Sequence, residues 1–421
     1  MKRVMLFVPR SDFLTSDRVM PPLAPFYLKS FLDAKGYSAE VCDDPEAFPM
    51  EGLRNFDLVG YSCTTPQSDL VITHCMEVKK YYPDKRTVIG GAHATFYKEE
   101  LTEGSPFDHI VAGEGELALL GILEGRNLDR LIEIPRMSVE MMNSIPIPWR
   151  SREFLERYTY YINGVRATTA VVGRYCPMGC KFCESRHSGL ILYTPERVGA
   201  ELLDIKNNCG FNAIMYYDDI FAINLKRVKE LCKVIKPHHV YFRCFAHART
   251  FSDEMAKVLA DAGCRAVCWG AESGHQKVLD VVGKGTHVED NYRMAEAILN
   301  NGMKATAFCM IGLPGENMET ITATEKFVAT FSVDPSFSFD YTIYYPFKKT
   351  YIRDHIHEYD LIVNKDHSQG YYKGKGGMSE CCISTSALSP DDIVRRRMEI
   401  CQKYSASYTG FMVGLKQMGK T

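Results

Sequence analysis

The sequence lacks three features that would place it in a specialised class of protein. Fifty Lys and Arg residues stand against 52 Asp and Glu, so the net charge of −2 argues against nucleic-acid binding by bulk positive charge. No run of about 18 uncharged apolar residues suggests a membrane span. The first apolar run ends at Pro9 and is too short for the core of a signal peptide. We therefore expect a cytoplasmic protein that binds neither membrane nor nucleic acid.

Cysteine, by contrast, is abundant, and its pattern argues against disulfides. The chain has 15 cysteines, an odd number, and most of them are scattered through apolar segments. Without an export signal, such residues are expected to be buried thiols in a reducing compartment. Cys176, Cys180 and Cys183, by contrast, lie within eight residues of one another in an irregular segment.

Hydrophobic residues make up 46% of the chain and charged residues 24%, as in ordinary globular proteins. At roughly 100–200 residues per domain, the 421 residues allow two or three domains. Residues 1–125 alternate short apolar runs with helical patterns, which predicts a doubly wound, Rossmann-like parallel sheet with its ligand side at the strand C-termini. The expected strands lie at 3–9, 37–42, 56–61, 86–89 and 107–111.

Residues 126–165 interrupt this alternation and, with their prolines, are predicted to be a linker. The alternation resumes over 166–345 and predicts a partial (β/α)6 TIM barrel. Its expected strands lie at 167–172, 213–217, 240–245, 266–270, 305–311 and 337–344. The tail over 346–421, of unassigned role, contains a Gly-rich loop at 370–377 and a helix expected from about 389 to 404.

The three clustered cysteines follow the first barrel strand. Thiolates at this spacing suit a soft metal centre. A four-iron cluster needs four thiolates, so three would leave one iron open. The alternatives are a structural zinc site, for which His187 is the nearest fourth ligand, and a loop without metal.

The segment Cys176-x3-Cys180-x-Phe182-Cys183 after a first barrel strand resembles the radical S-adenosylmethionine (SAM) enzymes. The resemblance implies a [4Fe-4S] cluster on Cys176, Cys180 and Cys183, with SAM on the open iron. In that family, an electron from a donor such as flavodoxin or ferredoxin reduces the cluster. SAM is then cleaved to methionine and a 5′-deoxyadenosyl radical, which removes hydrogen from unactivated C–H positions.

Four further segments, each after a strand, agree with this resemblance. Each taken alone could be a helix cap, a turn or a surface ion pair. By resemblance, Phe182 would lie near the adenine. Asp218 and Asp219 would receive the SAM amine, and Arg249 would bind the SAM carboxylate. Glu272 would accept from the ribose or the amine, and the Gly-Leu-Pro-Gly-Glu turn would pass the adenine. The residues matched to SAM are Phe182, Asp218, Asp219, Arg249, Glu272, Ser273, Ile311 and Gly312.

The first domain resembles the cobalamin-binding subclass of these enzymes. The matched residues follow the third, fourth and fifth strands and are Ser62, Thr64, Gly90, Gly91, His93, Gly113 and Glu114. Glycines there would let a large flat ligand approach the backbone. The Asp-x-His-x-x-Gly signature that places an imidazole on cobalt is absent, because Asp108 and His109 are adjacent. Tight turns, a loop histidine and helix-start acids are the alternative, and the domain would then bind no corrin.

The sequence therefore predicts a radical SAM enzyme that uses cobalamin to methylate an unactivated carbon of a small molecule. The alternatives are non-methylating radical chemistry (oxidation, cyclisation or rearrangement) and a zinc-binding structural protein. Cys381, Cys382 and Cys401 are expected to be plain thiols rather than a second cluster. No motif specifies the substrate. Tyr341, Tyr344 and Tyr345 could line its cavity, although core packing is the commoner use of such residues.

Overall fold

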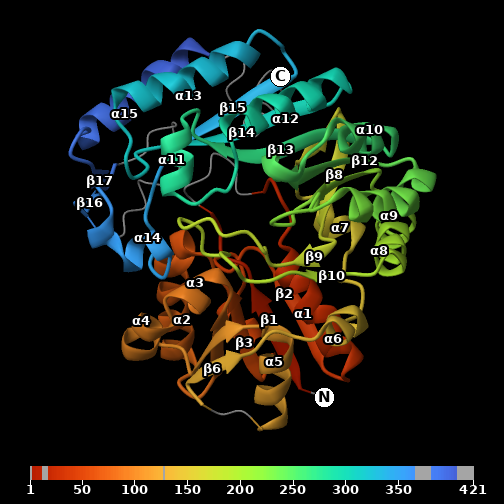
Figure 1. The fold of residues 1–421 in the computed structure, drawn as a ribbon. Helices are drawn as coiled ribbons and strands as arrows, with labels where there is room; N and C mark the ends of the chain where they lie inside the picture. The colour runs from red at the N-terminus through yellow and green to blue at the C-terminus, as the bar shows by residue number, and fades with distance from the viewer. Residues whose placement is uncertain (1, 12–17, 127–128, 366–380, 405–421) are drawn as a thin grey trace, which may run out of the picture. The chain divides into compact units, whose positions relative to one another are not determined.

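The computed structural model describes residues 2–11, 18–126, 129–365 and 381–404. It divides at Arg157 and Tyr158 into two compact units, which are described separately (Figure 1). Among the described residues, no helix is both long and apolar enough to cross a membrane. The Gly-rich loop predicted at 370–377 lies outside the described residues.

Unit 1 is built on a six-stranded parallel sheet with strand order β2-β1-β3-β4-β5-β6. Strands such as β1 and β3 are buried along nearly their whole length, because helices cover both faces. The predicted doubly wound sheet is confirmed. The strands are β1 (Arg3–Phe7), β2 (Ser38–Cys42), β3 (Leu58–Ser62), β4 (Arg86–Gly90), β5 (His109–Gly113) and β6 (Leu131–Ile134). The helices between them are α1 (Leu23–Ala34), α2 (Ser68–Tyr81), α3 (Ala92–Phe96), α4 (Lys98–Gly104) and α5 (Gly115–Glu124).

The order of the strands reverses between β1 and β3, which marks the switch point where doubly wound sheets bind ligands. Gln67 joins the loops after these two strands: its Nε2 donates to the Pro9 carbonyl at 2.8 Å and to Ser11 Oγ at 3.0 Å. The carboxyl edge of this sheet is therefore organised by hydrogen bonds between its loops.

The segment predicted to be a linker is partly folded. It contributes β6 to the sheet, followed by α6 (Val139–Ser144) and α7 (Arg152–Leu155). Trp149 packs edge-on against Phe26 of α1, with ring centroids 5.6 Å apart. The sixth strand escaped prediction because it has only four residues, including a charged Glu133.

Unit 2 contains a seven-stranded sheet with strand order β15-β14-β13-β12-β11-β8-β7. The six strands from β8 to β15 pair in parallel, as the predicted partial barrel requires, and β7 (Tyr161–Ile162) adds an antiparallel edge. The parallel strands are β8 (Val165–Ala170), β11 (Ala213–Tyr216), β12 (Tyr241–Ala246), β13 (Cys264–Glu272), β14 (Lys304–Ile311) and β15 (Phe337–Ile343). The longer helices are α8 (Pro195–Asn207), α9 (Leu225–Ile235), α10 (Asp253–Asp261), α12 (Val288–Asn300) and α13 (Met318–Phe331).

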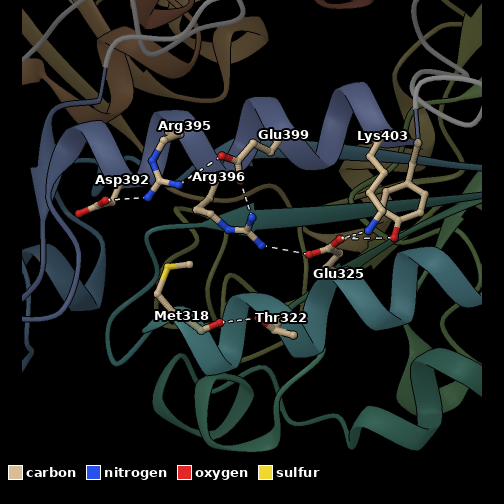
Figure 2. A network of polar contacts seen from close by, with 9 residues as sticks. Met318, Thr322, Glu325, Asp392, Arg395, Arg396, Glu399 and Lys403 are labelled. Atoms are coloured by element: carbon tan, nitrogen blue, oxygen red, sulfur yellow. Dashed lines mark hydrogen bonds and ion pairs between the residues drawn. The ribbon is translucent and has the colours of Figure 1, made fainter.

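The predicted C-terminal helix is α15 (Pro390–Lys403), which begins at a Ser389 capping box. Glu325 of α13 pairs with Arg396 at 3.0 Å and with Lys403 at 2.8 Å (Figure 2). Arg397 is buried, and its Nε donates to the Tyr341 carbonyl at 2.6 Å. Because β15 is an edge strand, α15 satisfies and covers a backbone group that would otherwise face solvent.

Two glycines of unit 1 test the close packing at the carboxyl edge. Gly113 has φ of 104°, and a Cβ there would lie 2.3 Å from the Ile134 carbonyl oxygen. Gly125 has φ of 73°, and a Cβ there would meet open space. We expect Gly125→Ala to cost about 1 kcal/mol of unfolding free energy. Gly113→Ala adds a backbone clash to the strain and should cost about 3 kcal/mol or more in urea unfolding. Equal losses would contradict the close approach.

Candidate functional site

The cysteine loop of unit 2 is closed at its base by a short antiparallel pair. β9 (Gly173–Arg174) leads into the loop and pairs with β10 (Ile191–Leu192), which leaves it. Within the loop, the His187 amide donates to the Met178 carbonyl at 2.8 Å. The His187 ring packs against Gly179, where a Cβ would lie 2.8 Å from it. His187 thus supports the shape of the loop.

The three loop thiols share one electrostatic environment. Burial raises the pKa of all three thiols above the usual value, that of Cys183 to about 12. The positive charge of Lys284 lowers the pKa of all three thiols. The negative charge of Asp219 raises the pKa of Cys176 and Cys183. Soft donors gathered beside a buried cation fit a negatively charged iron–sulfur cluster.

The zinc alternative needs donors that converge on one ion. Within the described ranges, no three Cys, His, Asp or Glu side chains converge so that they could hold one metal ion. A cubane places one thiolate on each iron, so its ligands need not converge on a single point. The tail thiols show no such grouping either, and the Cys381 thiol donates to the Ile383 carbonyl.

A buried ion pair lies beside the triplet. Lys284 Nζ is 2.6 Å from Glu272 Oε1, and each side chain is only 8% exposed. Although burial opposes the charge on Lys284, the Glu272 carboxylate and the Cys180 thiol raise its pKa above the usual value. Lys284 was not predicted, because a lone lysine after a short helix carries no sequence signal.

The two aspartates after β11 have different environments. Asp218 is buried, and its Oδ1 accepts from the Val172 amide at 2.8 Å. Burial raises the pKa of Asp218 to about 8. Asp218 therefore fixes the backbone that enters the cysteine loop. Asp219 is exposed and acts on the cluster thiols, so it is the better placed of the two for a SAM amine.

After β12, Arg249 is exposed, and its Nη1 lies 3.3 Å from the Cβ position of Gly285. His247, which no sequence motif indicates, is buried nearby in the chain. Burial and the nearby Lys284 and Arg249 lower the pKa of His247 to about 3, so its imidazole is neutral. Arg249 and Lys284 thus place two cations in the neighbourhood where a SAM carboxylate is expected.

The remaining residues matched to SAM mostly have structural contacts. Ser273 is buried and lies 3.3 Å from Thr324 Oγ1. Glu316 caps the turn after β14, where its Oε2 accepts from the Gly312 amide at 2.6 Å. Ile311 is buried in the strand before it, and Phe182 is half-buried with Lys284 Nζ 5.8 Å from its ring centre. Backbone atoms of the turn are thus held rigidly for any ligand.

Aromatic side chains lie near the carboxyl ends of three strands of this sheet. Phe245 of β12 and Phe308 of β14 stack with centroids 6.0 Å apart, and Gly270 on the strand between them has no side chain. Tyr217 meets Phe245 edge-on at 6.0 Å and is 53% exposed. Phe308 and Met310 are half-buried, whereas the alternate residues of β14 are buried. These partly exposed side chains offer an apolar surface.

Tyr341, Tyr344 and Tyr345 do not add to this surface in the way the cavity hypothesis supposed. All three side chains are buried, and Tyr341 is fully enclosed on the face of β15 opposite to Thr342. Core packing, the commoner role, is what the structure shows.

In unit 1, the residues matched to cobalamin separate into two groups. Gly91 and Gly113 are exposed at the carboxyl edge in the left-handed region, with exposed Thr64 and half-buried Ser62 and Gly90 beside them. None of these side chains is larger than threonine, so the backbone is accessible to a broad, flat ligand. This edge fits a corrin.

His93 and Glu114, by contrast, are buried. The His93 ring stacks on Tyr97 with centroids 4.9 Å apart, and its Nδ1 lies 3.4 Å from Thr65 Oγ1. An imidazole held in this way supports the loop, consistent with the absence of the Asp-x-His-x-x-Gly signature.

Comparisons with known proteins agree with both units. Residues 170–328 match the Radical SAM superfamily, and residues 12–123 match the B12 binding domain. The chain thus carries the domain of the radical SAM superfamily, a superfamily of enzymes. More narrowly, the chain belongs to the radical SAM enzymes that carry a B12-binding domain, which confirms the resemblance found in the sequence.

Curated relatives span most of the chain. An uncharacterized methyltransferase of Pyrococcus horikoshii is 28% identical over 332 residues, which cover 73% of this chain and 71% of that protein. The anaerobic magnesium-protoporphyrin IX monomethyl ester cyclase of Rubrivivax gelatinosus is 26% identical over 351 residues and 75% of this chain. This chain covers 63% of the cyclase.

Among solved structures, the radical SAM methyltransferase TsrM from Kitasatospora setae, with cobalamin and a [4Fe-4S] cluster bound, has a similar fold. Its TM-score is 0.74 at 17% identity, covering 98% of this chain and 90% of TsrM. The cobalamin-dependent radical SAM enzyme OxsB has a TM-score of 0.66 at 16% identity, covering 77% and 52%. The predicted fold class is confirmed.

The cluster assignment is tested by removing one thiolate. Cys180→Ala should reduce iron and acid-labile sulfide after anaerobic reconstitution to below about a tenth of wild type, because two thiolates hold a cubane poorly. Cys232→Ala removes a buried thiol of α9 and should leave the iron content unchanged. Full iron loading of Cys180→Ala would contradict the assignment.

Glu316 gives a prediction of pH dependence. Burial raises its pKa from 4.5 to about 8, so the folded protein holds this proton more tightly than the unfolded chain. Stability is therefore lost as the pH rises from about 4.5 toward 8, by at most about 1.4 kcal/mol per pH unit for one proton. Glu316→Gln keeps an acceptor for the Gly312 amide and should gain Tm relative to wild type as pH increases. A constant difference between pH 5.5 and 8 would refute this.

Proposed function

We propose that this protein is a cobalamin-dependent radical SAM methyltransferase that adds a methyl group to an unactivated carbon of a small molecule. The observation that supports it most is the presence, in one chain, of the three-cysteine loop of unit 2 and the small-residue carboxyl edge of unit 1. When bound, the cluster supplies the electron for reductive SAM cleavage, and cobalamin supplies a transferable methyl group.

The residues of the chain would bind and orient these groups. Cys176, Cys180 and Cys183 would hold the cluster, with the loop kept in shape by His187 and Asp218. Asp219 carries a negative charge suited to an ammonium group, and Arg249 a positive charge suited to a carboxylate. These opposite charges beside the cluster loop would fix the amino-acid end of SAM in one orientation.

The partly exposed aromatic row Tyr217, Phe245 and Phe308 supports a small-molecule substrate with an apolar or planar part. An electron donor such as flavodoxin or ferredoxin would serve the cluster. The relatives named as methyltransferases support methylation. The relative named as a cyclase makes non-methylating radical chemistry the second candidate.

Two measurements on anaerobically purified protein test the proposal. With SAM and dithionite, wild type and Cys232→Ala should form 5′-deoxyadenosine, and Cys180→Ala should not. With methyl-labelled SAM, hydroxocobalamin and dithionite to reduce the cobalt, label should appear in the extracted corrin. Label absent from a fully occupied corrin would favour the non-methylating candidate, and absence of corrin would refute cobalamin dependence.

The corrin site can be tested by steric filling. Ala92 is exposed at the carboxyl edge next to Gly91, so Ala92→Trp should lower corrin occupancy about tenfold or more. Ala34 is equally exposed, but it ends α1 at the opposite, amino edge of the sheet. Ala34→Trp should bind corrin as wild type does. Equal occupancy in the two variants, measured by visible absorbance, would place the corrin elsewhere.

A further inference from the structure

Lys284 lies beside the cysteine loop, where it pairs with Glu272, but unlike Glu272 it belongs to none of the motifs matched to SAM. We propose that Lys284 is a positioning residue that supplies the counter-charge for the cluster thiolates, and that Glu272 holds its ammonium in place. The proposal rests on the cluster alone and not on methyl transfer.

The backbone that carries Lys284 is fixed to the cysteine loop. The Lys181 amide, next to Cys180, donates to the Val282 carbonyl at 2.9 Å. Gly283 and Gly285 flank Lys284 with φ of 65° and 70°, and a Cβ at Gly283 would lie 3.1 Å from the Lys181 side chain. These contacts hold the lysine segment and the loop in one register.

The space around the pair is tightly packed. A Cβ at Gly270 would lie 1.9 Å from Glu272 Oε1 and 2.7 Å from Lys284 Nζ, so only glycine is tolerated opposite the pair. Glu272 itself has φ of 60°, a left-handed conformation that a non-glycine residue adopts at a cost. Burying two charges is also costly and adds little net stability. Such a combination is expected at a functional site.

The Lys284 ammonium reaches the cysteine loop: its Nζ lies 5.8 Å from the centre of the Phe182 ring, and Phe182 directly precedes Cys183. Burial raises the pKa of Cys180. Of the two charges, Lys284 lowers this pKa by more than Glu272 raises it. Lys284 also acts on Cys176 and Cys183, where Glu272 has no comparable effect. The positive end of the pair therefore lies beside the cysteine loop.

The sign of this arrangement matters for an iron–sulfur cluster. Each bound thiolate brings a negative charge, and reduction adds one more in a poorly solvated site. A fixed cation stabilises the reduced state more than the oxidised state and moves the potential to less negative values. Lys284 would thus ease cluster reduction.

Opposite charge changes at the two positions give opposite expected results. Lys284→Met leaves the Glu272 carboxylate beside the thiols and should move the midpoint potential of the reconstituted cluster to more negative values. Glu272→Gln leaves the ammonium unneutralised and should move it to less negative values. Lys284→Arg should restore a potential close to wild type. The readout is potentiometric titration followed by electron paramagnetic resonance of the reduced cluster, in full-length protein without substrate.

Lys236→Met is the matched control, because Lys236 pairs with Asp261 at the same 2.6 Å on the exposed surface. It should leave the potential unchanged. Shifts of the same sign in Lys284→Met and Glu272→Gln, or no shift in either, would overturn the proposal. Where Lys284→Met takes up no cluster, Glu272→Gln decides: a less negative potential supports the counter-charge role, and an unchanged one refutes it. Failure to find corrin would not affect these outcomes.

Discussion

Unit 2 brings three thiols, one buried and two half-buried, into one loop, and each would have to give up its proton to bind a cluster. Burial raises the pKa of each thiol, so the thiolate form is expensive until a metal centre and a counter-charge are present. Several neighbouring elements hold the loop in place and supply the counter-charge. Asp218 fixes the entry of the loop, β9 and β10 close its base, and Lys284 places a cation beside it.

The carboxyl edge of unit 1 is shaped by small residues rather than by buried charges. A broad ligand needs backbone access over several loops, and large side chains would block it. The residues at the carboxyl edge are therefore small, and the positive φ of Gly91 and Gly113 keeps the chain close to Cys63 and Ile134 without intruding on that edge. Side chains that could have reached a metal, such as His93, are turned into the interior and used for packing.

Much of this could be predicted from the sequence. The strand–helix alternation gave the two parallel sheets, and the short spacing of Cys176, Cys180 and Cys183 indicated the cluster. What could not be predicted depends on long-range contacts. Lys284 follows a six-residue helix, and its importance comes from Glu272, twelve positions earlier and on a different element. Likewise, nothing local distinguishes Asp218 from Asp219, because the buried one is selected by the Val172 amide, 46 residues away.

The C-terminal helix has a consequence for how the chain tolerates change. Arg397 reaches the last strand of the barrel, and Ile383 and Ile393 pack on Gly312, in the turn after β14. Truncation before Ser389 would remove α15 from the edge strand β15 and remove the Ile393 contact from the turn at Gly312. Insertions within α15 (Pro390–Lys403) should therefore disturb the last barrel strand and this turn together.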